Sequence, residues 1–484
     1  MVNNRDICFE FDKLHEECGV FGISTLPGSD IDPVYETFTG LFSLQHRGQE
    51  SCGIAVNDRG VISYHKDLGL VMDVFHEKLL QRLKGNAAIG HVRYSTTGDS
   101  IKENAQPIVV THIKGNLAIA HNGNLVNANE LRHQIEMAGG IFHSSNDSEI
   151  IAYIIVQERL GSKSIEEALM KAMRRISGAY SLLIMSPRKL IAARDPNGFR
   201  PLCMGKVAGH YVFASESCAI DAVGGEFIRD VSPGEIIVIE NGRMRALDSG
   251  LHAKKAFCSF EFIYFARPDS ILEGVSVEKV RQEMGRSLAR ENFADADIVV
   301  GVPDSGISAA IGYSLESGIP YGVGLIKNRY IGRTFIQPVQ GQRERAVKLK
   351  LNPLSANING KRVVLIDDSI VRGTTSARIV SALREAGAKE VHMRISSPPF
   401  LNACYFGTDV PDNDALIAYN NTVDETARVI GADSLAYLSR EALVSILGAE
   451  GCAVCDACFT GNYPIAPPSA SEKNIFGNRI INIV

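Results

Sequence analysis

One run of nine residues constrains the fold of the second half of this chain more than any other feature. It begins at Asp367, directly after the apolar residues 363–366, and leads into a helix predicted over residues 376–386. A second buried-type strand is predicted at 391–395. Alternation of strand, helix and strand predicts an α/β fold, in which a parallel sheet carries helices on both faces.

The polar residues of this run suit phosphate and ribose. They are Asp367, Asp368, Ser369, Arg372, Gly373, Thr374 and Thr375. Backbone N–H groups at a helix N-terminus, together with threonine hydroxyls, bind a phosphate monoester. Paired carboxylates suit ribose hydroxyls or a hydrated Mg²⁺. An isolated Asp pair at a strand end is usually a cap, but the complete run resembles the phosphoribosyl pyrophosphate motif of type I phosphoribosyltransferases.

A second loop fits the same resemblance. Residues 302–306 read Val-Pro-Asp-Ser-Gly; they follow an apolar strand and precede a helix predicted over 308–315. In the type I phosphoribosyltransferase fold a loop at this place holds pyrophosphate. The resemblance implies that Ser305 joins Asp367 and Asp368 around one Mg²⁺ per subunit.

A basic stretch over residues 327–334 lies between these two loops. Lys327 and Arg333 within it are predicted to bind the polyphosphate, and residues 343–350 extend the basic character. By itself such a stretch is usually a solvated surface segment. Between two loops of phosphate-binding type it is better interpreted as a hood whose closure excludes water from the reacting centre.

The first half of the chain has a different rhythm. Short apolar runs broken by Gly, Asn and Asp predict strands at 87–90, 117–120, 181–185 and 236–239. Helices are predicted after Asp147 and over 164–176, so an α+β layered domain is expected. A polar stretch at 248–256 marks the boundary. With 484 residues and 45% hydrophobic content, the chain can bury two cores of ordinary size.

Cys18 is the candidate nucleophile of the first half. A thiol attacks an amide as its thiolate, so a base must take its proton. If the peptide bond before Cys18 is cut, the freed α-amine can act as that base, since its reference pKa is about 7.7–8 against about 8.5 for a thiol. The alternative for any single cysteine is a buried strand residue.

Four further residues give Cys18 a chemical context. Asn122 and Gly123 offer a side-chain amide and a backbone N–H to a developing oxyanion, although Asn-Gly is also a hairpin-turn signal. Arg93 could hold a carboxylate with two hydrogen bonds, or could form a surface ion pair. Asp147 could hold an ammonium group, or could cap the helix that follows. Together these residues describe a glutamine amidase.

This half resembles the class II glutamine amidotransferase domain, which has an N-terminal nucleophile. Five ordered segments carry the resemblance: residues 18–22, 44–50, 91–96, 121–123 and 145–149. It implies that Cys18 is the nucleophile, that Asn122 and Gly123 form the oxyanion hole, and that Arg93 and Asp147 hold glutamine. It also implies a four-layer αββα sandwich over residues 18–250 and removal of residues 1–17 as a propeptide.

Four of the ten cysteines are candidates for metal binding. Cys455 and Cys458 form a CxxC pair, which could be redox-active, half of a zinc site or part of an iron–sulfur site. Cys258 and Cys404 lie far upstream. The alternative is four unrelated buried cysteines. Their flanking segments resemble the [4Fe-4S] ligand sites of one branch of glutamine phosphoribosylpyrophosphate amidotransferases, which implies one cluster per subunit and leaves Cys452 outside the ligand set.

The resemblance to this iron–sulfur, propeptide-containing branch extends over residues 18–463. It implies a phosphoribosyltransferase domain at 251–463, followed by a tail at 464–484 of no assigned role. It further implies that ammonia from glutamine displaces pyrophosphate from phosphoribosyl pyrophosphate, as the first step of purine synthesis. A homotetramer inhibited by purine nucleotides is expected.

Charge and hydropathy exclude other classes of partner. The net charge is −5, with 50 basic and 55 acidic residues, so nucleic acid is not expected as a partner. No apolar run reaches the roughly 20 residues that span a bilayer, and no secretory signal is evident, so a cytoplasmic location is expected. Two alternatives stay open: a class II amidotransferase that aminates a sugar phosphate, and a non-enzymatic regulator on a phosphoribosyltransferase fold.

Overall fold

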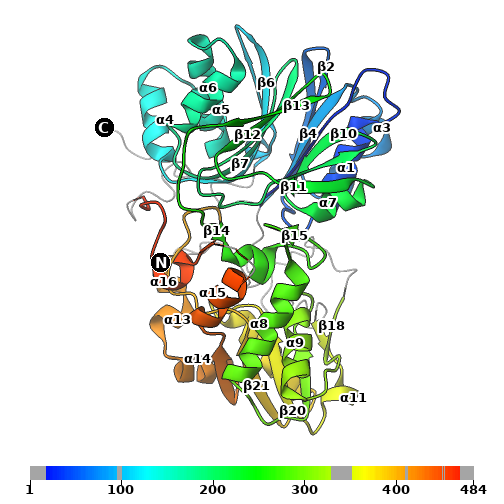
Figure 1. Cartoon of the computed structure of the whole chain (residues 1–484). Coiled ribbons are helices and arrows are strands. Elements are labelled where there is room, and N and C mark those ends of the chain that lie inside the picture. The colour runs from blue at the N-terminus through cyan, green and yellow to red at the C-terminus, as the bar shows by residue number, and fades with distance from the viewer. Residues whose placement is uncertain are drawn as a thin grey trace, which may run out of the picture.

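The computed structural model shows a chain of two domains, one above the other in Figure 1. The structure describes residues 18–94, 101–328, 351–408, 412–449, 451 and 453–468. The predicted propeptide, Arg333, the basic segment 343–350 and residues 469–484 of the tail lie outside the described residues. Within the described ranges no helix has the length and apolar character needed to cross a bilayer.

The first sheet of the upper domain has seven antiparallel strands in the order β11-β9-β10-β1-β4-β2-β3. The strands are β1 (Gly19–Ser24), β2 (Ser51–Asp58), β3 (Val61–Leu68), β4 (Ala87–Arg93), β9 (Cys203–Val207), β10 (His210–Ala214) and β11 (Glu226–Asp230). β1 lies in the middle of the sheet, and β4 is buried along its whole length. The residues at the ends of these two strands are therefore held by neighbours on both sides.

The second sheet has six antiparallel strands in the order β13-β12-β8-β7-β6-β5. They are β5 (Ile108–His112), β6 (Gly115–Leu125), β7 (Gly178–Met185), β8 (Lys189–Arg194), β12 (Glu235–Glu240) and β13 (Arg243–Asp248). The sheets face each other across a core that includes Val20 and Ile89 of the first and Leu183 and Ala120 of the second. A Cβ on Gly22 would lie 3.0 Å from Leu183 Cδ1, so the sheets are in close contact there.

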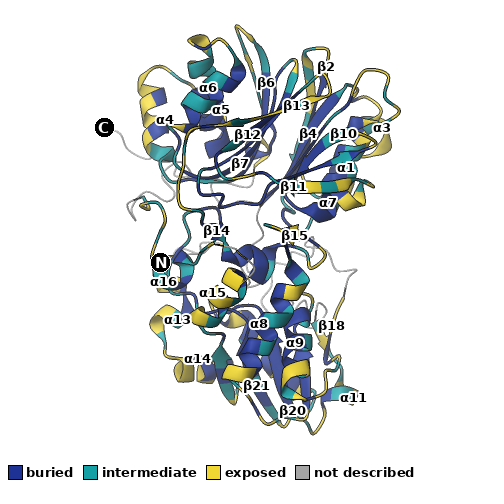
Figure 2. Cartoon of the chain, viewed as in Figure 1, coloured by how far each residue is buried: buried dark blue, intermediate teal, exposed yellow. Residues whose placement is uncertain are grey.

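Helices cover the outer face of each sheet, as Figure 2 shows by their exposed and buried sides. α1 (Pro33–Ser43), α2 (Val71–Val74), α3 (Glu77–Leu80) and α7 (Ser217–Ala222) pack on the first sheet, and α4 (Ala128–Met137), α5 (Asp147–Leu160) and α6 (Ile165–Met173) on the second. A short 3-10 helix, η1 (Lys102–Asn104), precedes β5. The predicted four-layer αββα sandwich is confirmed.

The lower domain is built on a four-stranded parallel sheet in the order β17-β20-β21-β22. Its main elements are β17 (Ile298–Gly301), β20 (Arg362–Asp367), β21 (Glu390–Ile395), β22 (Ser434–Tyr437), α8 (Val277–Glu291), α9 (Ile307–Ser317), α12 (Thr374–Glu385), α14 (Val423–Ile430) and α15 (Arg440–Ala449). α8, α9 and α15 share one core cluster, and α12 and α14 share another on the opposite face. The predicted parallel sheet with helices on both faces is confirmed.

Shorter elements complete this domain. They are β14 (Phe257–Cys258), η2 (Glu261–Phe265), β15 (Ile271–Leu272), β16 (Val275–Ser276), β18 (Leu325–Lys327), β19 (Leu351–Pro353), α11 (Ser355–Ile358), η3 (Asn413–Ala415), α13 (Ile417–Asn420), β23 (Val454–Cys455) and α16 (Ala457–Thr460). β14 pairs in parallel with β23 at the junction of the domains, so the start of the lower domain and its C-terminal part lie side by side.

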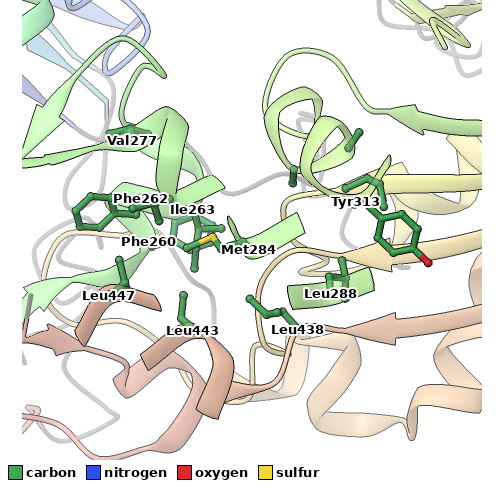
Figure 3. Close-up of a cluster of buried hydrophobic side chains, with 14 of the residues drawn as sticks. Phe260, Phe262, Ile263, Val277, Met284, Leu288, Tyr313, Leu438, Leu443 and Leu447 are labelled. Carbon is green, nitrogen blue, oxygen red and sulfur yellow. The ribbon is translucent and has the colours of Figure 1, made fainter. Parts of the chain in front are cut away.

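α8 and α9 cross at a contact of their backbones. A Cβ on Gly285 of α8 would lie 1.9 Å from the carbonyl oxygen of Ala309, and one on Gly312 of α9 would lie 1.9 Å from that of Gln282. Around this contact Met284, Leu288 and Tyr313 belong to the core shown in Figure 3. The absence of side chains at the two glycines is therefore what lets the helices pack so closely on the sheet.

Gly285→Ala should destabilise the protein by about 1–3 kcal/mol, because the new methyl group forces two packed helices apart. Gly448→Ala is the matched control: Gly448 is also helical, in α15, and a Cβ there meets no atom within 4 Å. This control should stabilise by about 0.5–1 kcal/mol, since alanine restricts the unfolded chain. Thermal unfolding midpoints measure both, and a Gly285→Ala midpoint equal to or above the wild-type value would contradict the backbone contact.

Candidate active sites

Cys18 stands directly before β1, at the end of the central strand pair of the first sheet. Gly19 pairs with Val92, so the next positions along the two strands are Cys18 and Arg93. Cys18 is 8% exposed, and its thiol donates to the carbonyl oxygen of Tyr94 at 3.6 Å. The carbonyl oxygen of Cys18 accepts from Nε of Arg47 at 3.0 Å. The candidate nucleophile is thus held at a fixed place beside the predicted carboxylate-binding arginine.

Asn122 and Gly123 lie inside β6 and pair with Ser181 and Tyr180 of β7, so the hairpin-turn alternative is wrong. Nδ2 of Asn122 is buried and has no hydrogen-bond partner among the described residues. A buried donor without a partner is rare in proteins and often marks a site for a missing group. At Gly123 the backbone has φ +141°, and a Cβ would lie 2.1 Å from the carbonyl oxygen of Ala179. These features suit a glycine and an amide that both serve a bound oxyanion.

Arg93 and Asp147 are both buried in the structure. Arg93 is 2% exposed, which is inconsistent with the surface ion pair considered as an alternative. Asp147 is the first residue of α5; Asn146 is the N-cap and accepts from the N–H of Ser148, so the helix-cap alternative for Asp147 is wrong.

Asp147 is held as a carboxylate. Its Oδ2 accepts from the N–H of Leu125 at 2.9 Å, and its Oδ1 lies 3.5 Å from Nδ1 of His121. Burial alone would raise the pKa of Asp147, but His121, the Leu125 N–H and Arg93 together hold it below its ordinary value. A buried ionised carboxylate close to a buried arginine is an arrangement that can hold the two charged α-groups of an amino acid.

The predicted magnesium ligands converge at the carboxyl end of the parallel sheet. Asp367 ends β20, and both Asp367 and Asp368 are 1% exposed. Oδ2 of Asp368 accepts from the hydroxyl of Ser305, which lies on the loop after the neighbouring strand β17. Oδ1 of Asp368 accepts from Oγ of Ser369 at 2.5 Å. The two predicted loops therefore form one site in the folded chain.

The start of α12 forms the other side of this site. Gly373 is its N-cap with φ +85°, and Thr374 and Thr375 begin the helix. A Cβ on Gly373 would lie 2.6 Å from Cδ1 of Ile417, so both its conformation and its surroundings require glycine. Lys327 donates to Asp304 at 2.7 Å and so lies at the Ser305 loop. Arg372 is exposed at the same turn.

The four candidate cluster cysteines surround one cavity. Its other lining residues are largely aromatic, and the cysteines are Cys258, Cys404, Cys455 and Cys458. Cys258 pairs with Cys455 in the β14–β23 ladder, and the N–H of Phe406 donates to the sulfur of Cys404 at 3.4 Å. Burial and the three neighbouring thiols raise the pKa of Cys458 well above its ordinary value. The cysteines are thus neighbours in the fold.

The four thiols line one cavity together with aromatic side chains. The cavity lining thus agrees with the donor set of an iron–sulfur cluster, whose ligands are cysteine thiolates.

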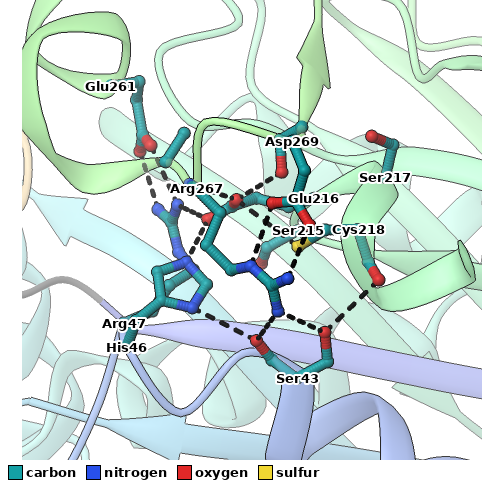
Figure 4. Close-up of polar contacts among 12 residues, drawn as sticks. Ser43, His46, Arg47, Ser215, Glu216, Ser217, Cys218, Glu261, Arg267 and Asp269 are labelled. Carbon is teal, nitrogen blue, oxygen red and sulfur yellow. Dashed lines mark hydrogen bonds and ion pairs between the residues drawn. The ribbon is translucent and has the colours of Figure 1, made fainter. Parts of the chain in front are cut away.

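A set of buried charges lies at the domain junction, at positions to which no sequence motif assigns a chemical role (Figure 4). Arg47 donates from Nη1 to Oε1 of Glu216 at 2.6 Å and from Nη2 to Oε1 of Glu261 at 2.7 Å, and all three side chains are fully buried. Arg200 lies 3.4 Å from the same Glu261 oxygen. We refer to Arg47, Arg200, Glu216 and Glu261 as the junction cluster. Arg47 and Glu261 are 214 residues apart, so no local pattern signals their contact.

Comparisons with known proteins agree with both candidate sites. Residues 91–222 match the model of a glutamine amidotransferase domain, and residues 276–396 that of a phosphoribosyl transferase domain. The chain is 51% identical to the amidophosphoribosyltransferase of Methanocaldococcus jannaschii, covering 92% of this chain and 97% of the relative. It is 48% identical to that of Bacillus subtilis, covering 94% and 95%.

Solved structures give the same result. A glutamine phosphoribosylpyrophosphate amidotransferase from B. subtilis, complexed with ADP and GMP, superposes with a TM-score of 0.86 at 47% identity, covering 92% of this chain and 97% of that one. This likeness removes the two alternatives, an amidotransferase for another acceptor and a non-enzymatic regulator. The chain therefore belongs to the amidophosphoribosyltransferase family, and it joins a glutamine amidotransferase domain to a phosphoribosyltransferase domain.

Proposed function

We propose that Cys18 hydrolyses glutamine and that the released ammonia is used at the Asp367–Asp368 site to convert phosphoribosyl pyrophosphate into 5-phosphoribosylamine. The observation that supports the residue assignment most strongly is the buried Nδ2 of Asn122, which has no partner among the described residues. A buried amide donor that has no partner before the reaction can donate to an oxyanion that forms during it, and so stabilises the transition state more than the bound substrate.

The first half-reaction follows from the side chains around Cys18. Arg93 holds the α-carboxylate of glutamine and Asp147 its α-ammonium group. The Cys18 thiolate attacks the carboxamide carbon, and the oxygen becomes an oxyanion that accepts from Nδ2 of Asn122 and the N–H of Gly123. The C–N bond then breaks, ammonia leaves, and a glutamyl thioester remains. Water attacks the thioester, releases glutamate and restores the thiol.

Removal of residues 1–17 would free the base for this reaction. With the leader attached, the nitrogen of Cys18 is an amide and cannot take a proton. After cleavage it is an amine, which takes the thiol proton and returns it to the departing nitrogen. The thiol of Cys18 donates to the carbonyl oxygen of Tyr94, and the freed amine belongs to the same residue, so base and nucleophile are next to each other by construction.

The second half-reaction takes place at the carboxyl end of the parallel sheet. The 5-phosphate binds at the start of α12 on Thr374, Thr375 and the backbone N–H groups. Asp367 and Asp368 face the ribose hydroxyls, and Lys327 with the Ser305 loop faces the pyrophosphate. Ammonia attacks C1 of the ribose as the C1–O bond to pyrophosphate breaks. A Mg²⁺ held by Asp367, Asp368 and Ser305 would neutralise charge on the leaving group.

The four cysteines are proposed to hold one [4Fe-4S] cluster per subunit. Such a cluster would cross-link β14, the segment that carries Cys404 and the β23–α16 region. In this proposal the cluster would supply structure instead of redox chemistry. The donor set and the cavity support this assignment.

Regulation and assembly are proposed from the relatives. The B. subtilis structure holds ADP and GMP, which supports inhibition of this chain by purine nucleotides. We propose in addition that the chain acts as a cytoplasmic homotetramer at the first step of purine synthesis. Neither nucleic acid nor a membrane is part of this proposal.

Glutamate release by anaerobically purified protein tests the two-site proposal directly. Phosphoribosyl pyrophosphate with Mg²⁺ should stimulate it strongly, and pyrophosphate should appear in an equal amount, because both sites act in one cycle. Glutamate release that is indifferent to phosphoribosyl pyrophosphate would contradict the coupling of the sites. Absence of release, from protein confirmed to begin at Cys18, would contradict the assignment of the nucleophile.

Cys18→Ala should abolish synthesis from glutamine and keep synthesis from added ammonia, because only the first half-reaction needs the thiol. Cys203→Ala is the matched control, since Cys203 is a buried thiol of β9, two strands away from β1 in the first sheet. Steady-state assays with each nitrogen source measure the effect. Equal loss of both activities in Cys18→Ala would refute the separation into two sites.

Cys455→Ser should yield protein without the brown absorbance of an iron–sulfur cluster and with a lower unfolding midpoint. The substitution replaces a cysteine thiolate, the ligand that iron–sulfur clusters use, with a serine hydroxyl. It also leaves that hydroxyl in the cavity, where water reaches it poorly. Cys452→Ser is the control, because Cys452 stands outside the proposed ligand set. Visible absorbance and iron content decide the result; a normal spectrum in Cys455→Ser would remove this residue from the ligand set.

A further inference from the structure

A loop of the lower domain lies directly against the strand that carries the oxyanion hole. Nδ2 of Asn124, one residue after Gly123, donates to the carbonyl oxygen of Tyr405 at 3.0 Å. A Cβ on Gly407 would lie 3.3 Å from the carbonyl carbon of Gly123. The segment 403–408, which we call the clamp loop, thus reaches across the domain junction and contacts β6 at this point.

Arg200 fixes the clamp loop from the side of the upper domain. Its guanidinium donates twice to the carbonyl oxygen of Phe406, from Nε at 2.9 Å and from Nη2 at 2.7 Å, and to Oγ1 of Thr408 at 3.2 Å. Arg200 is fully buried. The ring of Phe406 stacks on Phe199 with centroids 4.3 Å apart. The loop therefore has little freedom to move independently of the upper domain.

Two glycines make this contact possible. Gly407 has φ +113°, and a Cβ on it would also lie 3.1 Å from Nη2 of Arg200. On its other side Gly123 has no room for a side chain either, because a Cβ there would lie 2.1 Å from the carbonyl oxygen of Ala179. Gly123 therefore lies between β7 on one side and Gly407 of the clamp loop on the other, with no room for a side chain at either glycine.

We propose that the clamp loop is a working part of the glutaminase site, with Asn124 and Gly407 as positioning residues for the oxyanion hole. This inference rests on the proposed role of Asn122 and Gly123. Oxyanion stabilisation depends on donors held at hydrogen-bond distance from the place where charge develops, so a small shift of β6 lowers the rate. The same loop contains Cys404, and one short segment therefore joins the cysteine cluster to the oxyanion hole.

Gly407→Ala and Asn124→Ala test the proposal in the full-length, cleaved enzyme. Each should lower kcat for glutamine hydrolysis by about 10- to 100-fold with little change in KM, because the oxyanion donors act in the transition state and not in the bound ground state. Ammonia-dependent synthesis should remain at the wild-type rate. The rate at which iodoacetamide alkylates Cys18 should also equal the wild-type rate, because alkylation requires the thiol but does not require the oxyanion hole.

Two matched controls separate positioning from folding. Gly318→Ala places a Cβ on a residue with φ +75° that has no atom within 4 Å of the new methyl group. It therefore adds the strain of a positive φ, as Gly407→Ala does, without a steric clash. Asn357→Ala removes an amide bond of the same kind, from Nδ2 to the carbonyl oxygen of Val323 at 2.8 Å, far from the junction. Both controls should keep the wild-type kcat for glutamine.

The outcomes distinguish this inference from the proposed function. If the wild-type enzyme hydrolyses glutamine and both clamp-loop variants keep its kcat, the clamp loop has no positioning role. A rise in KM with unchanged kcat, or a parallel fall of hydrolysis, alkylation and ammonia-dependent synthesis, would also overturn it. If the wild-type enzyme does not hydrolyse glutamine, the proposed function itself fails.

Discussion

The junction cluster is the interaction on which the arrangement of the two sites depends. Arg47 and Arg200 supply two positive charges, Glu216 and Glu261 two negative ones, and all four side chains are fully buried. Glu261 is the member that comes from the lower domain. Burial alone would raise the pKa of Glu216, but His46 and Arg47 hold it well below the ordinary value. Removing one member would leave a partner charged and buried, which typically costs about 3–5 kcal/mol.

This cluster also holds the candidate nucleophile in place, because Nε of Arg47 donates to the carbonyl oxygen of Cys18 at 3.0 Å. From Glu261 the contacts continue through η2: the carbonyl oxygens of Phe262 in η2 and of Ala266 directly after it accept from Arg281 of α8 at 2.7 and 2.8 Å. Burial lowers the pKa of Arg281 to about 10, and the nearby carboxylate of Asp368 acts in the opposite direction. Buried polar contacts thus connect Cys18, through Arg47, Glu261 and η2, to Arg281 of α8.

What the sequence could predict follows the range of the interactions involved. The strand, acidic pair and helix around Asp367 are local, and their types and order were predictable from spacing alone. Asn122 and Gly123 were expected to stand just beyond a strand, but β6 continues through them, because eight residue pairs with β7 outweigh the turn preference of Asn-Gly. The contact of Arg47 with Glu261 depends on how two domains dock, and no periodicity reports it. The cysteine grouping was accessible through family resemblance and not through spacing.

The contacts across the junction also show why the two domains act as one unit. The lower domain supplies the Glu261 carboxylate to Arg47 and the carbonyl oxygens of Tyr405 and Phe406 to Asn124 and Arg200. Without the lower domain, Arg47 and Arg200 would lose these acceptors. A buried donor left without an acceptor costs more free energy than its hydrogen bond contributes. The docked lower domain therefore supplies acceptors to buried donors of the upper domain at several points.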